Sequence, residues 1–137
     1  FGFAASKDVK FDPSNSTRAV GGANAFPAYT TNGGASWSFA TGLPTTGRKE
    51  FAYAPSNPSI VYVSAEAGDI YKSTDGGQTY SQVNANAGHQ AGGQGWYDVA
   101  IWVNPTNENH LVVGGLDLYQ STDGGATFTK ISRWYNS

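Results

Sequence analysis

The sequence predicts an all-β fold of about three four-stranded units, and two repeated markers support that prediction. The first marker is an octet, which reads TTNGGASW, STDGGQTY and STDGGATF at residues 30–37, 73–80 and 121–128. The third residues of successive octets are 43 and 48 residues apart. The second marker is a turn, 18 to 20 residues before the third octet residue, that contains Pro13, Pro55 or Pro105. A repeat of ~40 to 50 residues is typical of the blades of a β-propeller.

Four short strands are expected in each unit. Apolar and β-branched runs precede the proline turns at residues 9–11, 51–53 and 99–103, and similar runs follow them at residues 18–20, 60–63 and 111–113. A third strand leads into the octet, as at residues 70–72 and 118–120, and a last strand follows it, as at residues 127–131. No helical period is present. We therefore expect one propeller segment over residues 1–137, with approximate blades at residues 1–42, 43–87 and 88–137.

The composition excludes several classes of function. The 137 residues include 18 glycines and 14% aromatic residues but only 13% charged residues, which is typical of turn-rich β proteins. The net charge of −2 is spread without runs, so we expect neither nucleic-acid binding nor attraction to an anionic membrane. No apolar stretch approaches the ~20 residues of a membrane helix, so membrane insertion is not expected. The absence of cysteine excludes disulfides, thiolate metal sites and cysteine nucleophiles.

The octets resemble the Asp-box, or BNR, repeat S-x-D-x-G-x-T-W. This repeat occurs in the β-propellers of sialidases, xyloglucanase-type glycoside hydrolases and sortilin-like receptors, and in many large secreted bacterial proteins. Asp75 and Asp123 stand in near-complete copies, whereas the first copy has Thr30 and Asn32 at the Ser and Asp positions and alone keeps the tryptophan, Trp37. The resemblance covers essentially the whole chain and implies a propeller whose hairpins are Asp-boxes.

The chemistry of the octet explains its residues without a ligand. An Asp at the start of a tight turn accepts hydrogen bonds from the N–H groups of that turn, a glycine pair supplies positive φ, and the final aromatic residue packs beneath the hairpin. Calcium binding needs more oxygen ligands than the octet offers. We therefore expect structural roles for the following residues: Asn32, Gly34, Trp37, Ser73, Asp75, Gly77, Thr79, Tyr80, Ser121, Asp123, Gly125, Thr127 and Phe128.

A binding site is expected on the propeller face opposite the octets. If the octets and the proline turns share one face, the other loops emerge on the opposite face, where loops vary without disturbing the sheets. Those loops are predicted at residues 21–25, 66–69 and 114–117, and the crossovers between blades at residues 42–49 and 84–96.

The second crossover is the most unusual of these segments, because it is long and rich in glycine and amides. It reads NANAGHQAGGQGW and continues into Tyr97, so that Trp96 stands beside side chains able to donate and accept hydrogen bonds. An aromatic ring beside amides is a common way to bind a sugar. The candidate glycan-binding residues are Trp96, Tyr97, His89, Gln90 and Gln94. The alternative is a glycine-rich spacer in which Trp96 packs against the neighbouring blade.

Candidate catalytic carboxylates lie in the same loops: Glu66, Asp98 and Asp117. Glycoside hydrolysis needs two of them at a defined separation, which the sequence does not supply. Asp69 and Asp117 occupy equivalent places before a strand, where Asp also suits a turn. Xyloglucanase-type enzymes carry an Asp in a comparable region within a T-D-x-G-G pattern that this chain lacks.

Other active-site chemistries are not expected in this segment. A sialidase carries three substrate-binding arginines and an F/Y-R-I-P motif, whereas the only arginines here are Arg18, Arg48 and Arg133, and the motif is absent. His89 and His110 lie in no zinc-binding pattern. We therefore predict no metal site and no cofactor.

Three blades are too few for the usual ring of ~4 to 8 blades. We expect either that the segment belongs to a longer polypeptide with a six- to eight-bladed propeller, which we favour, or that a second copy completes a six-bladed ring. The stretch GQGWYDVAIWVNPTNENHLVVGG resembles segments of large secreted bacterial surface proteins, which implies a secreted or cell-surface setting in bacteria.

The leading functional hypothesis is a binding or scaffold module, with a glycan as the ligand and no enzymatic activity of this segment alone. One alternative is part of a xyloglucanase-type glycoside hydrolase. The other is a purely structural propeller or a homodimer that completes its own ring.

Overall fold

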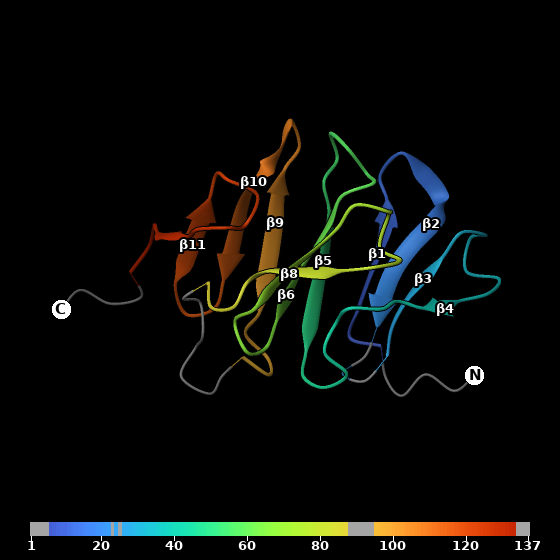
Figure 1. Cartoon of the computed structure of the whole chain (residues 1–137), viewed down its shortest axis with the longest axis horizontal. Coiled ribbons are helices and arrows are strands. Elements are labelled where there is room, and N and C mark those ends of the chain that lie inside the picture. The colour runs from blue at the N-terminus through green and yellow to red at the C-terminus, as the bar shows by residue number, and fades with distance from the viewer. Residues whose placement is uncertain (1–5, 23, 25, 88–94, 134–137) are drawn as a thin grey trace.

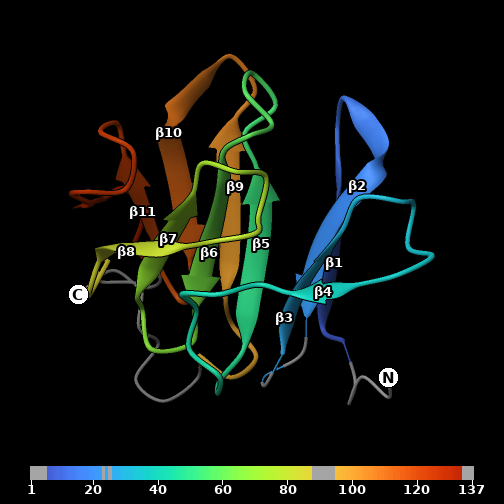
Figure 2. The same cartoon turned by 45° about the vertical axis from the view of Figure 1, so that its right-hand side comes forward.

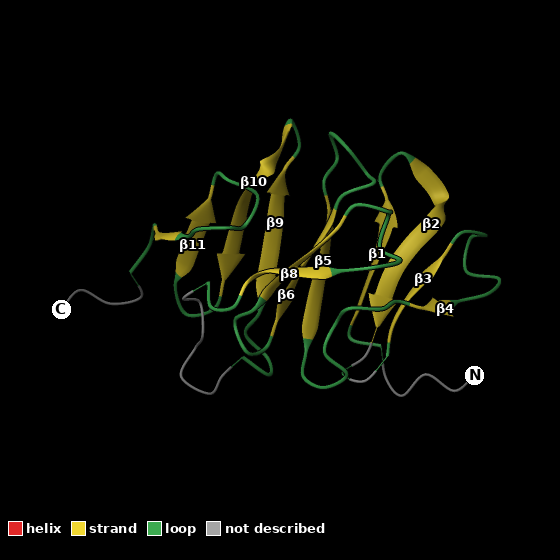
Figure 3. Cartoon of the chain, in the orientation of Figure 1, coloured by secondary structure: helices red, strands yellow, loops and turns green. Residues whose placement is uncertain are grey.

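The computed structural model describes residues 6–22, 24, 26–87 and 95–133. Every regular element in these ranges is a β-strand, and no helix is present among them (Figure 3). The strands form three four-stranded antiparallel sheets that stand side by side (Figure 1). The all-β fold and the three four-stranded units predicted from the repeats are therefore confirmed. The sheets are called blades 1, 2 and 3 below.

Each blade is a meander in which consecutive strands pair with one another. Blade 1 contains β1 (Asp8–Asp12), β2 (Asn15–Gly22), β3 (Pro27–Thr30) and β4 (Ser38–Phe39). Blade 2 contains β5 (Lys49–Tyr53), β6 (Val61–Ala65), β7 (Ile70–Ser73) and β8 (Ser81–Asn84). Blade 3 contains β9 (Ala100–Asn104), β10 (Asn107–Gly114), β11 (Leu118–Ser121) and β12 (Thr129–Lys130). The last strand is shorter than the predicted run because Thr127 still belongs to the octet turn, where its N–H binds Asp123.

The first strand of each blade lies innermost. β5 contacts β1 on one side and β9 on the other, whereas the fourth strands lie at the periphery. The same order of blades is visible after a 45° turn (Figure 2). This arrangement is that of propeller blades around an axis.

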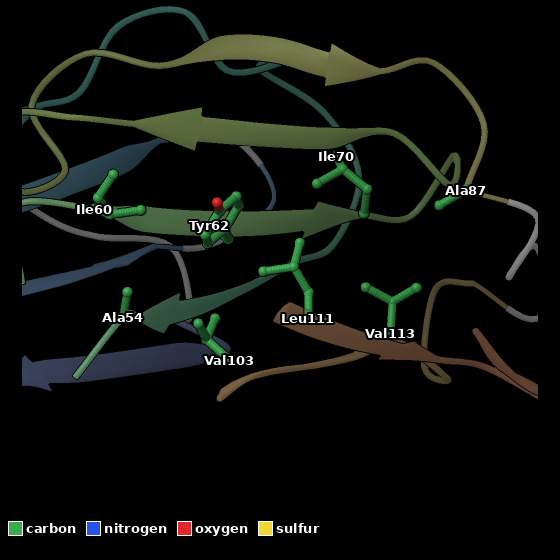
Figure 4. Close-up of a cluster of buried hydrophobic side chains, with 8 residues drawn as sticks. All are labelled: Ala54, Ile60, Tyr62, Ile70, Ala87, Val103, Leu111 and Val113. Carbon is green, nitrogen blue, oxygen red and sulfur yellow. The ribbon is translucent and has the colours of Figure 1, made fainter. Parts of the chain in front are cut away.

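Blade 2 is covered on both faces, and its second strand shows the consequence. All five residues of β6 are buried and apolar or small, because successive side chains point into different junctions. Val61 and Val63 pack in the core between blades 1 and 2, together with Val20 of β2. Tyr62 packs in the core between blades 2 and 3, toward Leu111 of β10 (Figure 4).

The octet turn of blade 2 is held together by one carboxylate. Asp75 Oδ1 accepts hydrogen bonds from the backbone N–H groups of Gln78 and Thr79, both at 2.9 Å, and from Ser73 Oγ at 2.7 Å. Asp75 Oδ2 accepts one from Thr79 Oγ1 at 2.6 Å. Burial opposes ionisation of Asp75, but these hydrogen bonds outweigh it and lower its pKa to about 2. All these partners belong to the turn itself.

The other two octets use the same positions. Asp123 accepts from Thr127 N–H at 2.9 Å, Thr127 Oγ1 at 2.5 Å and Ser121 Oγ at 2.8 Å. The hydrogen bonds from the Thr127 side chain and backbone, and from Ser121, lower the pKa of Asp123 to about 2. In the first octet Asn32 Oδ1 accepts from Ser36 N–H at 2.9 Å, while its amide donates to Ser36 Oγ at 2.8 Å. An amide therefore satisfies the same turn with one hydrogen bond reversed.

Each octet turn is also fixed to the second strand of its blade. In each octet the first glycine of the pair donates its N–H to a backbone carbonyl near the start of that strand. The hydrogen bonds run from Gly33 to Thr17 (2.8 Å), from Gly76 to Ser59 (2.8 Å) and from Gly124 to Asn109 (2.9 Å). The next glycine has positive φ in every copy, as at Gly77, where φ is 96° and an added Cβ would collide with Val20 of blade 1.

The peripheries of blades 1 and 2 continue onto the octets of blades 2 and 3, respectively. Thr41, just after β4, donates its N–H to Gln78 O at 3.0 Å and accepts from Tyr80 N–H at 2.9 Å. Asn84, at the end of β8, donates its side-chain amide to Ala126 O at 2.8 Å. Gly42 has φ of 84° and lies so close to Tyr80 O that no Cβ fits. Hydrogen bonds thus join neighbouring blades at their outer strands.

The meander places two kinds of connection at opposite ends of the blades. Proline turns and octet turns lie at one end, called the octet end, because strands 1–2 and 3–4 of an antiparallel meander are joined on the same side. The loops between strands 2 and 3 and the crossovers between blades lie at the other end, called the crossover end, at the bottom of Figure 1. The crossover end is where the candidate binding residues were predicted.

We expect Asp75→Ala to lower the free energy of unfolding by about 2 kcal/mol, because it removes a charged acceptor of several hydrogen bonds. Asp75→Asn should cost less than half as much, because Asn32 already serves in the equivalent place. Urea denaturation of both variants measures the difference. Equal losses in the two variants would show that the charge, rather than the acceptor geometry, holds the turn.

Acid should destabilise the fold between pH 4 and 2. The folded-state pKa of about 2 for Asp75 and Asp123 lies below the ordinary value of 3.8, so their contribution is present above that value and is lost as the pH falls toward 2. Thermal unfolding followed by circular dichroism should therefore show a shallower acid dependence in the Asp75→Asn, Asp123→Asn double variant. An unchanged acid dependence would contradict this assignment.

Candidate functional site

The crossover end of blades 2 and 3 gathers an arginine, two carboxylates and two exposed aromatic rings. Glu50 lies in β5 and Arg48 directly precedes that strand, and the side chains of the two residues lie on one face, where they form a hydrogen-bonded pair. Glu66 follows β6 directly, and Trp96 with Tyr97 ends the second crossover. This set is called the Arg48 cluster.

Arg48 connects the members of the cluster. Its Nε and Nη2 donate to Glu50 Oε1 at 3.1 and 2.5 Å, and its Nη1 donates to Tyr97 O at 2.8 Å. Its backbone N–H donates to Glu66 Oε2 at 2.7 Å. One residue therefore holds two carboxylates and the backbone beside the aromatic pair.

Glu66 is enclosed by two glycines. Its N–H donates to Arg48 O at 2.9 Å, which extends the pairing of β5 and β6 by one step. A Cβ added at Gly95 would lie 2.4 Å from Glu66 O, and one at Gly47 would lie 3.2 Å from Glu66 Oε2. Gly95 thus allows the second crossover to pass directly against the loop that carries Glu66.

Trp96 and Tyr97 form an exposed aromatic pair. Their side chains are 58% and 46% exposed, their ring centroids are 4.4 Å apart, and the rings meet edge to face at 75°. Arg48 fixes the carbonyl of Tyr97, so the backbone beneath the pair is held to blade 2. Exposed aromatic rings on a fixed backbone can cover an apolar ligand face at little entropic cost.

The electrostatic environment of Glu50 differs from that of an exposed carboxylate. Burial raises its pKa above the ordinary value, and the hydrogen bonds from Arg48 act in the opposite direction. The cluster therefore combines a desolvated carboxylate with a guanidinium that stabilises its ionised form.

Lys49 points away from this cluster into the junction of blades 1 and 2. It is buried, and its Nζ donates to Asn24 O at 2.8 Å, Thr46 O at 3.0 Å and Gly47 O at 2.8 Å. Burial lowers its pKa to about 8, opposed by the charge of Glu66. Lys49 thereby joins the crossover of blade 2 to a loop of blade 1.

The remaining predicted carboxylates do not join the Arg48 cluster in one constellation. Asp98 is half-buried just before β9, next to Tyr97 in the chain. Asp117 pairs with Lys130 of β12, at the periphery of blade 3, and its Oδ1 is buried without a hydrogen-bond partner. The Asp69 carbonyl accepts from Ala65 N–H, as expected of a turn.

Three of the predicted ligand-binding residues, His89, Gln90 and Gln94, lie outside the described residues. His110 is held between Asn104 and Gln120 on blade 3, with ring-nitrogen distances of 3.1 and 2.9 Å. Among residues 6–22, 24, 26–87 and 95–133 no group of three or more His, Cys, Asp or Glu side chains is placed to hold a metal ion. In the same ranges no helix is long and apolar enough to cross a membrane.

Sequence reasoning missed Arg48, Lys49 and Glu50. The sequence did contain a signal for these residues, because Arg48-Lys49-Glu50 is a run of three charged residues in a chain with only 13% charged residues. The run stands directly before an apolar strand, where charged side chains need partners. Strand alternation then sends Lys49 into one junction and its two neighbours toward the other.

The fold and the site define the chain as three consecutive blades of a β-propeller. No family model and no curated protein matches it. One similar solved structure is an ancestral GH74 enzyme, with 20% identity and a TM-score of 0.71, and this chain covers 18% of its length. Another is the GH74 xyloglucanase from Xanthomonas campestris, with 15% identity and a TM-score of 0.71, and this chain covers 23% of its length. A third is YCF48 from Cyanidioschyzon merolae (16%, 0.64), of which it covers 36%.

These alignments include 94%, 90% and 92% of this chain, respectively. The chain therefore spans well under half the length of each of these propellers. Identities this low establish the fold alone.

Lys49→Met should lower the free energy of unfolding by about 2 kcal/mol, because three carbonyls lose their buried donor. Hydrogen exchange should increase at residues 46–48, which the ammonium group holds in place. Lys7→Met, at an exposed position, is the matched control and should leave both measurements unchanged. Unaltered exchange at residues 46–48 in Lys49→Met would contradict the role given to Lys49.

Proposed function

We propose that the chain is a binding module of an extracellular bacterial β-propeller and that it binds a glycan at its crossover end. The observation that carries the proposal is the exposed Trp96–Tyr97 pair, whose backbone Arg48 holds beside Glu50 and Glu66. We take the octets to be Asp-boxes with a purely structural role.

The chemistry of the Arg48 cluster suits a carbohydrate. The faces of a pyranose ring carry C–H groups that pack on an aromatic ring, and its hydroxyls bind carboxylates and guanidinium groups. Trp96 offers the ring, and Glu66 and Arg48 lie in the same cluster. The small net charge of −2 also agrees with a neutral ligand.

Xyloglucan is the first glycan to test, because one of the similar solved structures is a xyloglucanase. That similarity suggests a probe and does not transfer a substrate. A set of plant and bacterial polysaccharides should be tested beside it.

The second candidate function is a contribution to a glycoside hydrolase site. It is favoured by the presence of two carboxylates, Glu50 and Glu66, around one arginine, with the pKa of Glu50 raised by burial. Asp117 is less suited to such a role because it is paired with Lys130. Assaying Glu50→Gln, Glu66→Ala and Asp98→Ala for both glycan retention and sugar release separates the two functions, since only an enzyme loses turnover. A purely structural propeller would retain no glycan at all.

Trp96→Ala should weaken glycan binding about tenfold, which corresponds to the loss of about 1.4 kcal/mol from one aromatic contact. Affinity electrophoresis in gels that contain xyloglucan or the best glycan of the set measures the change. Phe39→Ala removes an equally exposed ring from blade 1 and should bind as the wild type does. Full retention of binding in Trp96→Ala would overturn the placement of the site.

A further inference from the structure

Every step from an asparagine or aspartate to a glycine lies at the same place in an octet. The 137 residues contain three such steps, which are Asn32-Gly33, Asp75-Gly76 and Asp123-Gly124, and only the first begins with an amide. Glycine has no Cβ, so its backbone nitrogen can approach the preceding side chain more freely than that of any other residue. An asparagine that precedes glycine therefore loses its amide group more readily than other asparagines do.

Loss of the amide at Asn32 involves two groups of the same turn. The Gly33 nitrogen gives up its proton and attacks Asn32 Cγ, a Cγ–N bond forms, the Cγ–Nδ2 bond breaks, and ammonia leaves with that proton. Water then opens the resulting succinimide ring at one of its two carbonyls, which yields aspartate or isoaspartate at position 32. Solvent water is the only co-reactant.

The folded octet occupies both groups. Gly33 N–H donates to Thr17 O at 2.8 Å, so the nitrogen that would attack is fixed to β2. Asn32 Oδ1 accepts from Thr30 Oγ1 and from Ser36 N–H, both at 2.9 Å, and Asn32 Nδ2 donates to Ser36 Oγ at 2.8 Å. The reaction must therefore pass through a local opening of the turn that breaks these hydrogen bonds.

The other two octets have this protection and a second one. Their first glycines also donate the N–H to the second strand. Burial opposes the ionisation of Asp75, but hydrogen bonds lower the pKa of both Asp75 and Asp123 to about 2, so both are carboxylates at neutral pH. A carboxylate resists attack by nitrogen far better than an amide does. Asn32 is therefore the octet position that opening exposes to reaction.

The first octet can also hold the aspartate that the reaction forms. With aspartate at position 32, one carboxylate oxygen still accepts from Ser36 N–H, and the Ser36 hydroxyl turns to donate to the other, because a hydroxyl both donates and accepts. Blade 2 already shows this arrangement, in which Thr79 Oγ1 donates to Asp75 Oδ2 at 2.6 Å. Isoaspartate adds a methylene to the backbone instead, so the turn cannot close in the same way.

We propose that Asn32 is a latent deamidation site, at which the folded octet withholds the reaction and accepts its aspartate product. Opening of the turn followed by deamidation and reclosure gives the first octet the carboxylate that the other two carry. Each such event adds one negative charge to the octet end of blade 1. The proposal is independent of the glycan site, which lies at the crossover end of blades 2 and 3.

Peptide mapping of the full chain by mass spectrometry tests whether the fold withholds the reaction. The chain is incubated at mildly alkaline pH in buffer and in guanidinium chloride. Aspartate and isoaspartate at position 32 should form at least about ten times more slowly in the folded chain. Gly33→Ala is the control for the chemistry in guanidinium chloride, where the added Cβ should slow the reaction. Equal rates for the wild-type chain in the two solutions, or no reaction in either, would overturn the proposal.

Two matched substitutions test whether the octet accepts the product. Asn32→Asp should leave the midpoint of thermal unfolding at neutral pH unchanged, because the Ser36 hydroxyl can reverse its hydrogen bond. Asn84→Asp makes the same change where the amide donates to Ala126 O at 2.8 Å, and a carbonyl cannot become a donor. That variant should unfold a few degrees lower. A loss in Asn32→Asp as large as that in Asn84→Asp would show that the octet rejects the carboxylate, and the proposal would be wrong.

Discussion

Packing of one sheet against the next is the constraint on which this structure depends. A four-stranded sheet whose two faces are both apolar cannot be stable in water by itself, and neighbouring blades here bury such faces against one another. Blade 2 shows the full solution, because every residue of β6 is buried between two cores. Blades 1 and 3 each pack against blade 2 on one side, and Val9, Phe11 and Trp102 of these two blades are about half exposed among the described residues.

Hydrogen bonds at the edges keep the sheets aligned, while burial of the apolar side chains between their faces supplies the free energy that stabilises the fold. The octet turn closes on its own Asp or Asn, binds the second strand through its first glycine, and receives the outer strand of the preceding blade. Lys49 performs a comparable task at the crossover end, where its ammonium group joins two blades through main-chain carbonyls. Rigid connections at both ends explain how the crossover end can hold Arg48, Glu66 and Trp96 in fixed relation.

The fold was largely predictable from the sequence and the site only in part. The octets and proline turns recur in step, so the four strands of each blade could be placed to within a few residues. Trp96, Tyr97 and Glu66 could be selected because the meander sends their loops to one end. Arg48 could not, since its contact with Tyr97 joins residues 49 positions apart and depends on how blade 3 sits on blade 2. The sequence also could not show that Asp117 lies apart from the Arg48 cluster. Asp117 pairs instead with Lys130 across the edge of a sheet.

By itself the sequence determined what is local: the repeat, the all-β fold, the chemistry of the octet turns and the alternation of side chains along each strand. These follow from hydrogen bonds and backbone preferences within about ten residues. The tertiary structure alone decided which of two alternating faces meets which neighbour, and therefore that Lys49 enters a junction while Arg48 organises a surface cluster. Such facts depend on distances between residues far apart in the chain, and only the packing of complete sheets sets those distances.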